Sequence, residues 1–147
     1  MVSCVLSWEG ISKPVIVDTQ KTKVNSEYYT NHLKNDLLPV MNQFYPHNDG
    51  IFAQDGASSH TSNLCQKFIS KEFGKGRMIS KKQWPPHSPD LNPLDYYFWV
   101  EVQTKVFKGR REPFKELKEL ETQIQTVWAA ASNQDKLHNS FQGSWLL

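Results

Sequence analysis

Residues 84–95 read WPPHSPDLNPLD, and this stretch restricts how the second half of the chain can fold. Four of the chain's eight prolines lie within it. Because proline fixes φ and donates no backbone hydrogen bond, the stretch belongs neither inside a helix nor in a central strand. Proline is well tolerated in the first turn of a helix, so Pro93 predicts a helix start. Asp95 would then lie in that first turn.

A second acidic residue follows an apolar run. IFAQ at residues 51–54 predicts a short strand, and Asp55 comes directly after it. The carboxyl ends of strands in α/β sheets are where ligands bind, although Asp followed by Gly is also a common turn. Asp95 has a similar alternative, because an acid in a first turn is favoured by the helix dipole alone. Asp90 competes for that capping role.

The remaining layout alternates strand and helix patterns. Residues 1–7 and 15–17 predict a hairpin with a turn near Gly10, and a further short strand is expected near residues 78–79. Strands mixed with helices in this order indicate an α/β domain with a mixed sheet. One domain is the expectation for 147 residues.

Four helices are predicted. The first begins after Asn25 or Ser26 and runs to about residue 44, and Pro39 within it predicts a kink or a break. The second helix starts near HTS at 60–62, and Gly74 and Gly76 end it. The third begins after Pro93 and the fourth covers residues 114–131. The buried stripes of the second and fourth helices are expected to be Leu64, Cys65, Phe68, Ile69 and Phe73, then Leu117, Leu120, Ile124, Val127, Trp128 and Ala131.

Composition excludes several classes of protein. A mean hydropathy of −0.60 and the lack of an apolar run near 18 residues argue against a membrane span. Cys4 and Cys65 form no CxxC pair, so buried thiols in a reducing compartment are expected. The net charge is only +2, so any DNA contact needs a local basic surface. The candidates for it are Lys67, Lys71, Lys75, Arg77, Lys81, Lys82, Lys105, Lys108, Arg110 and Arg111.

Asp55 and Asp95 are the residues whose combination points to chemistry. Carboxylates that converge on one point bind hard divalent cations through oxygen, and such sites can hold two ions for phosphodiester chemistry. His60 follows Asp55 by five residues. Imidazole suits Zn or Cu better than Mg, so His60 could orient a water, contact a phosphate, support the Asp55 loop or be purely structural. No zinc spacing, nucleophile elbow or glycine-rich phosphate loop is present in the sequence.

Two motifs resemble a known family. IFAQDGASSHTS at 51–62 resembles the second-aspartate motif QQDxAPxHT of Tc/mariner-type transposases, and SPDLNPLD at 88–95 resembles that family's third-acid motif. Asp55 and Asp95 match the second and third catalytic, metal-binding acids, with 39 residues between them. That gap resembles the subgroup with three aspartates. Weaker likeness extends over SWEGIS and VNSEYYTNHLKNDLLPVM, so the resemblance covers roughly residues 3–130.

The resemblance implies an RNase H-like mixed sheet with flanking helices, and Mg²⁺ or Mn²⁺ as cofactor. It implies cut-and-paste DNA transposition in the nucleus, with transposon ends and target DNA as partners and a homo-oligomer as a possible assembly. His60 and Asn92 become candidates to support the acids or to contact DNA.

The sequence also departs from the family pattern. The family's first catalytic aspartate is expected upstream of SWEGIS and is not in this chain, since Asp18 follows the wrong strand. The helix-turn-helix region is also missing, and Ser58 replaces a proline. We therefore expect residues 1–131 to be a partial catalytic domain, N-terminally truncated with its first, central strand missing, and residues 132–147 to be a divergent tail. Unpaired edges predict a marginal, aggregation-prone domain, which cooperative unfolding of a monomer above about 50 °C would refute.

Three functional readings stay open. The chain could be a fragment or decayed copy of a transposase catalytic domain, inactive alone; Mg²⁺-dependent cleavage by this chain would overturn that reading. It could instead belong to a longer, active transposase whose frame starts further upstream, which the genomic sequence before Met1 would reveal. It could also be a domesticated DNA- or protein-binding module, whose function in cells would survive Asp55→Ala with Asp95→Ala.

Overall fold

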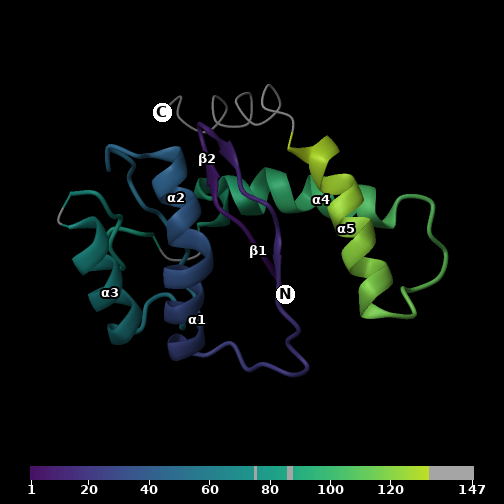
Figure 1. Ribbon diagram of the computed structural model, residues 1–147, viewed down its shortest axis with the longest axis horizontal. Helices are drawn as coiled ribbons and strands as arrows, with labels where there is room; N and C mark the ends of the chain where they lie inside the picture. Colours follow the sequence, from purple (N-terminus) through teal and green to yellow (C-terminus); the bar gives the residue numbers. More distant parts are fainter. Residues whose placement is uncertain (75, 86–87, 133–147) are drawn as a thin grey trace. The chain divides into compact units, whose positions relative to one another are not determined.

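The computed structural model describes residues 1–74, 76–85 and 88–132 of the chain. These residues form two compact units. The first unit comprises Met1 and Val17–Ser88, and the second comprises Val2–Ile16 and Pro89–Leu147, of which residues up to 132 are described. The chain therefore starts the second unit, leaves it to build the first, and returns to complete the second (Figure 1).

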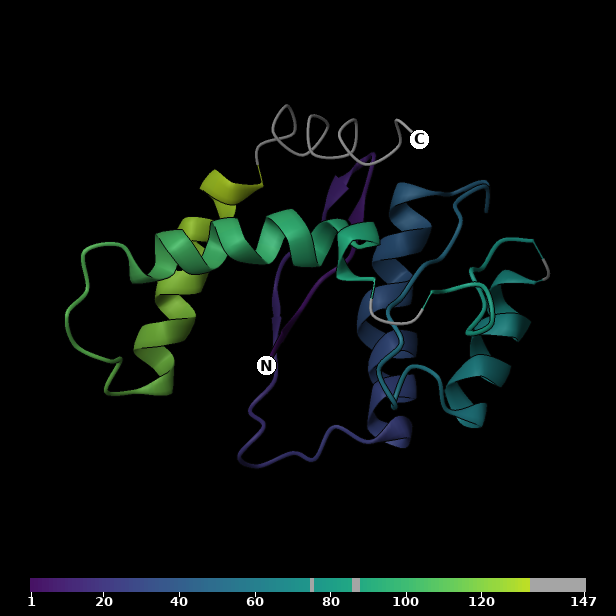
Figure 2. The ribbon, with the colours of Figure 1, turned by 180° about the vertical axis from the view of Figure 1, so that it is seen from behind.

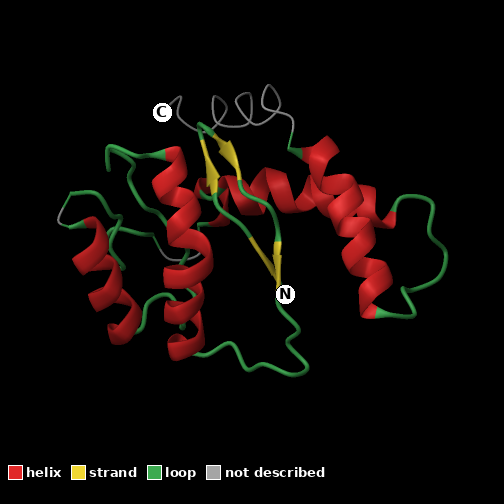
Figure 3. Ribbon diagram, viewed as in Figure 1, coloured by secondary structure: helices red, strands yellow, loops and turns green. Residues whose placement is uncertain are grey.

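A β-hairpin opens the second unit, as the sequence predicts. Strand β1 (Val2–Ser3) pairs antiparallel with β4 (Val15–Ile16), and β2 (Leu6–Ser7) pairs with β3 (Gly10–Ile11) (Figure 3). Gly10 turns the chain with φ 143°, a conformation that favours glycine. Between the two short ladders, the Val5 N–H donates to Ser12 Oγ and the Ser12 N–H donates to the Val5 carbonyl, both at 2.9 Å. These bonds keep the hairpin together where its regular pairing is interrupted.

The helices of the second unit follow the proline-rich stretch. A 3₁₀ turn, η2 (Pro89–Leu91), precedes a π-helical turn, η3 (Leu94–Phe98), which continues directly as α4 (Trp99–Phe107). The helix start predicted at Pro93 is confirmed, because Pro93 caps η3 and Asp95 lies in its first turn. The first helical turn is a π-helix, which the sequence did not indicate.

The last helix, α5 (Leu117–Ala131), begins three residues later than predicted. The physical reason is local: Phe114 packs its ring edge-on against Phe107, with 5.6 Å between centroids, and the Arg110 guanidinium lies 3.7 Å from the Phe114 centroid. These contacts hold the segment before Leu117 outside the helix.

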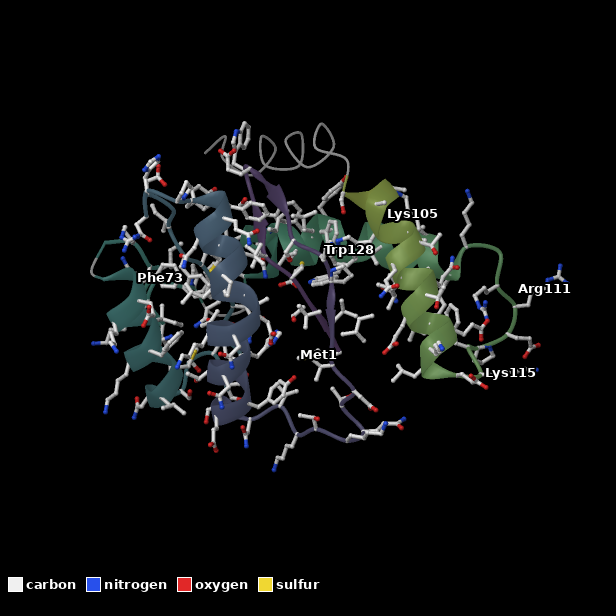
Figure 4. All side chains as sticks on the ribbon, in the orientation of Figure 1. Met1, Phe73, Lys105, Arg111, Lys115 and Trp128 are labelled. Carbon is white, nitrogen blue, oxygen red and sulfur yellow. The ribbon has the colours of Figure 1, made fainter. Side chains whose placement is uncertain are left out.

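The core of the second unit joins the hairpin to α4 and α5. Trp128 lies edge-on to Phe98, with 4.9 Å between ring centroids, and its Nε1 donates to the Ser12 carbonyl at 2.9 Å. Figure 4 labels Trp128 on α5 beside the hairpin. The buried members of this cluster are Cys4, Phe98, Val102, Val106, Ile124, Trp128 and Ala131. The predicted stripe of the fourth helix is buried at its C-terminal half, whereas Leu117 is 46% exposed.

A long helical segment begins the first unit. It consists of α1 (Ser26–His32), a π-helical turn η1 (Leu33–Leu37) and α2 (Leu38–Phe44). The Asn25 side chain caps α1 by accepting the Tyr28 N–H at 2.8 Å, as predicted. The predicted break at Pro39 is wrong, because helical structure continues through it (Figure 1). The wider π turn just before Pro39 accommodates a ring that would clash in a regular α-helix.

The strand predicted at residues 51–54 is reduced to a single parallel bridge between Phe52 and Met78. Phe52 donates its N–H to the Arg77 carbonyl at 2.9 Å and accepts the Ile79 N–H at 2.8 Å. The prediction of a second strand near residues 78–79 is confirmed only to this extent. A bridge of one residue supplies too few backbone hydrogen bonds to extend into a ladder. The RNase H-like mixed sheet stays a prediction.

Helix α3 (Asn63–Phe73) follows, with Ser62 as its N-cap and Gly74 as its C-cap at φ 72°. Figure 2 shows α3 beside α1, seen from behind. Cys65 and Ile69 are fully buried as predicted, but Leu64 is 48% exposed, so its place in the buried stripe is wrong. None of the helices among the described residues is long and apolar enough to cross a bilayer. The predicted single domain over residues 1–131 stays a prediction, and the predicted tail lies outside the described residues from 133 onward.

Candidate functional site

Asp55 lies in the loop between the Phe52 bridge and α3, in the first unit. Its Oδ1 atom accepts the Ala57 N–H at 3.0 Å and lies 2.5 Å from Nδ1 of His60. No described residue donates a hydrogen bond to Oδ2 of this carboxylate. The Asp55 side chain is 43% exposed. Solvent and a ligand can therefore approach this carboxylate.

The hydrogen bond from His60 favours the ionised form of the Asp55 carboxyl. It is the largest influence that holds the pKa of the Asp55 carboxyl below its usual range, with a smaller contribution from the Ala57 N–H and an opposing one from burial. Asp55 is therefore ionised over a wider pH range than an ordinary aspartate. A carboxylate that is charged and partly exposed is a suitable ligand for a hard cation.

His60 is itself held by two neighbours that sequence reasoning did not select. Its ring lies on Tyr29 of α1, with 4.0 Å between the centroids. Gln54 accepts the Tyr29 hydroxyl at 2.9 Å and donates Nε2 to the His60 carbonyl at 3.1 Å. Tyr29 lies in the first predicted helix, and nothing in the sequence connected it with Asp55 or His60. The position of Gln54 directly before Asp55 was the one sequence signal for its involvement.

Asp95 lies in the second unit, in the first turn of η3. Asn92 donates Nδ2 to Asp95 Oδ2 at 2.8 Å, and its backbone carbonyl accepts the Asp95 N–H at 2.8 Å. The Asn92 side-chain oxygen also accepts the Leu94 N–H at 3.3 Å. Asn92 therefore fixes one oxygen of Asp95 and satisfies backbone donors that the helix start leaves open.

Asp90 and Asp95 differ in their surroundings. Asp90 is exposed in the η2 turn, while Asp95 is half-buried at the start of the helix. The assignment of Asp95 rather than Asp90 as the functional acid stays a prediction.

The two acids belong to different units, so the structure describes each with its own neighbours. Among residues 1–74, 76–85 and 88–132, no group of three or more His, Cys, Asp or Glu side chains could hold a metal ion. The donor chemistry nevertheless fits Mg²⁺ or Mn²⁺, because both acids offer carboxylate oxygen. Each fixed carboxylate could supply one or two of the ligands that such an ion requires.

The basic side chains named from the sequence divide into paired and exposed groups. Lys105 bonds to Glu101 at 2.7 Å, and Arg110 bonds to Glu119 at 2.9 Å. Arg111 points outward from the α4–α5 loop (Figure 4). Four of the named basic residues in the first unit are exposed, namely Lys67, Lys71, Lys81 and Lys82, whereas Arg77 donates to the Asn48 carbonyl. Lys75 lies outside the described residues.

Comparison with known proteins identifies the class. The profile of the family described as DDE superfamily endonuclease matches residues 12–121, which is most of the 147-residue chain. The chain therefore belongs to the DDE superfamily endonucleases. The matched region includes Asp55, His60, Asn92 and Asp95.

Individual relatives narrow the class to Tc/mariner-type transposases. The chain is 28% identical over 111 residues to the transposable element Tc3 transposase of Caenorhabditis elegans. It is 38% identical over 80 residues to the transposable element Tcb2 transposase of Caenorhabditis briggsae. These alignments cover 74% and 54% of this chain but only 32% and 26% of the relatives. The chain thus spans about a third of their length or less.

Proposed function

We propose that this chain supplies part of a DNA-cleaving and strand-transferring centre, with Asp55 and Asp95 as ligands for divalent metal ions. The observation that carries the proposal is that both acids of the matched family region are individually fixed. His60 holds Asp55 and Asn92 holds Asp95. An acid that serves only as a turn or cap residue needs no such partner at its carboxylate.

Mg²⁺ or Mn²⁺ bound there would supply positive charge for the phosphodiester oxygens and a more acidic water. The chain's own contribution is orientation. His60 Nδ1 and the Ala57 N–H occupy Asp55 Oδ1, which leaves Oδ2 to face a ligand. Asn92 donates to Oδ2 of Asp95, which leaves Oδ1 of that carboxylate to face a ligand.

Two carboxylates supply fewer oxygens than the six that Mg²⁺ prefers. Water, DNA phosphates or carboxylates outside these 147 residues would complete the coordination. We therefore propose that the chain alone binds metal weakly and does not cleave DNA. An RNase H-like sheet, a nuclear location and homo-oligomerisation belong to the same proposal.

Mn²⁺ titration of the ¹⁵N-labelled chain tests the metal site, because a bound paramagnetic ion broadens nearby resonances. Broadening should centre on Asp55 and Asp95 and weaken in Asp55→Asn and Asp95→Asn. Asp90→Asn is the matched control, since it removes an exposed acid from the same motif. Equal broadening in all three variants and the unchanged chain would contradict the proposal.

Binding of a fluorescent DNA duplex tests the partner. If Lys67, Lys71, Lys81 and Lys82 contact phosphates, their combined replacement by Gln should weaken binding and flatten its dependence on salt. Replacement of the paired Lys105 and Arg110 by Gln is the control. A DNA affinity that survives the first set of changes would show that this surface is not the DNA contact.

A further inference from the structure

We propose that Tyr29 and Gln54 are positioning residues that set the ring orientation of His60 and, through it, the Asp55 carboxylate. Gln54 lies in the motif that resembles QQDxAPxHT, but that resemblance gives it no role, and Tyr29 lies outside both motifs. The inference uses contacts within the first unit only. Its link to metal binding rests on the function proposed above.

The hydrogen bonds of Gln54 can run in one direction only. The His60 backbone carbonyl can only accept, so the Gln54 amide nitrogen must face it, at 3.1 Å. The amide oxygen then faces the Tyr29 hydroxyl at 2.9 Å, and the hydroxyl must donate. Tyr29 is buried, with 8% of its surface exposed, which shields this chain of bonds from water.

Tyr29 acts on His60 in two ways, one direct and one through Gln54. Its hydroxyl acts through Gln54 on the His60 backbone, and its ring lies against the imidazole with 4.0 Å between centroids. Gln66 of α3 adds a second donor to the His60 carbonyl at 3.0 Å. The backbone and the ring plane of His60 are therefore held from α1, α3 and the residue before Asp55.

The fixed ring determines which nitrogen faces Asp55. His60 Nδ1 lies 2.5 Å from Asp55 Oδ1, and a carboxylate can only accept. Neutral His60 must therefore carry its proton on Nδ1, which leaves Nε2 without a proton. A rotated ring would bring a different atom to Asp55 and remove one of the two hydrogen bonds to its Oδ1 atom, leaving only that from the Ala57 N–H. If Tyr29 and Gln54 position the His60 ring, neutral His60 should be observed as the Nδ1–H tautomer.

The tautomer can be read from long-range ¹H–¹⁵N NMR spectra of the 147-residue chain at alkaline pH. Tyr29→Phe keeps the ring contact and deletes the hydroxyl. Gln54→Glu keeps an acceptor for Tyr29 and places an oxygen against the His60 carbonyl. Both variants should raise the fraction of the Nε2–H tautomer of His60 at least about twofold, because the His60 ring is no longer held with Nδ1 facing Asp55. Tyr28→Phe is the matched control on α1 and should leave the spectrum unchanged.

Wild-type tautomer fractions in both Tyr29→Phe and Gln54→Glu would overturn the proposal. Mn²⁺ affinity is the second readout, and loss of a group that orients a metal ligand typically lowers affinity about tenfold or more. If Asp55→Asn leaves Mn²⁺ binding unchanged, the proposed function fails, while the tautomer measurement still decides whether Tyr29 and Gln54 position His60.

Discussion

Trp128 donates its indole N–H to the backbone carbonyl of Ser12 at 2.9 Å, across a separation of 116 residues. This bond is buried and connects the last helix to the opening hairpin. It satisfies a carbonyl beyond the short ladder of β2 and β3, and it fixes the ring that packs edge-on against Phe98. The hairpin is thereby attached to the helical core by a specific contact as well as by apolar packing.

Trp128→Phe should lower the free energy of unfolding by about 1–3 kcal/mol, since it leaves the buried Ser12 carbonyl without its donor. Trp128→Ala should cost about 3–5 kcal/mol because it also opens a cavity. Urea denaturation followed by circular dichroism measures both. Val100→Ala on α4, where the side chain is 56% exposed, should change stability by less than about 0.5 kcal/mol. A Trp128→Phe variant as stable as this control would show that the indole bond contributes nothing.

Asn92→Ala should destabilise the second unit by about 1 kcal/mol. The change removes the acceptor for the Leu94 N–H and the donor to Asp95 at the start of the helix. Asp90→Ala is the matched change within the same motif, and its effect should be near zero because Asp90 is exposed. Chemical denaturation of both variants gives the comparison. Equal losses would mean that the Asn92 side chain is not a structural cap.

Gly74→Ala should cost about 1–2 kcal/mol, because Gly74 ends α3 at φ 72° and an L-residue is strained there. The space around the new methyl group is open, so backbone strain is the sole cause. Gly56→Ala offers the control: it also has open space, and its φ lies outside the left-handed region. Thermal unfolding should show a lower Tm for Gly74→Ala alone. A matching loss in Gly56→Ala would point to a general effect of the added methyl group.

Stability should fall as the pH rises above about 8.5, where an unfolded thiol begins to ionise. Burial raises the pKa of the Cys4 thiol to about 12 and also raises the pKa of Cys65. The unfolded state then loses protons that the folded state keeps, so the free energy of unfolding decreases by up to about 1.4 kcal/mol per pH unit for each thiol. The full contribution of the buried, protonated thiols to the free energy of unfolding is therefore present below about pH 8.5.

Urea denaturation between about pH 8 and 10, below the ordinary tyrosine pKa, measures this slope. Cys4→Ala should reduce the slope, whatever its effect on stability at neutral pH. Cys65→Ala provides an independent check in the first unit. An unchanged slope in both variants would mean that the thiols titrate in the folded state as they do when exposed.

Local signals were sufficient to predict where α1 and the helix of Asp95 begin, although not where α5 begins. Asn25 caps α1 and Pro93 begins the helix of Asp95, because the determining side chains lie within a few residues of the backbone groups that they affect. The family resemblance named His60 and Asn92 as candidates to support the acids or to contact DNA, and sequence separations of five and three residues keep them close to Asp55 and Asp95.

Features that depend on distant partners could not be predicted. The strand at residues 51–54 has the right composition, but a ladder also needs pairing beyond the single bridge at Phe52. The role of Tyr29 depends on a contact with Gln54 that spans 25 residues, and apolar periodicity carries no information about the direction of its hydroxyl. Pro39 was predicted to kink or break the first helix, but helical structure continues through it after a π-helical turn at Leu33–Leu37.

The discontinuous second unit has a consequence for synthesis on the ribosome. The hairpin of Val2–Ile16 emerges before its packing partners on α4 and α5, which follow only after residues 17–88 have been made. At about 5–20 residues per second, the 116 residues from Ser12 to Trp128 take roughly 6 to 23 s to translate. An isolated two-stranded hairpin is marginal in water, so the nascent chain exposes it throughout that interval. The speed of translation and the chaperones near the exit tunnel should therefore influence the yield of folded protein more than they would for a unit continuous in sequence.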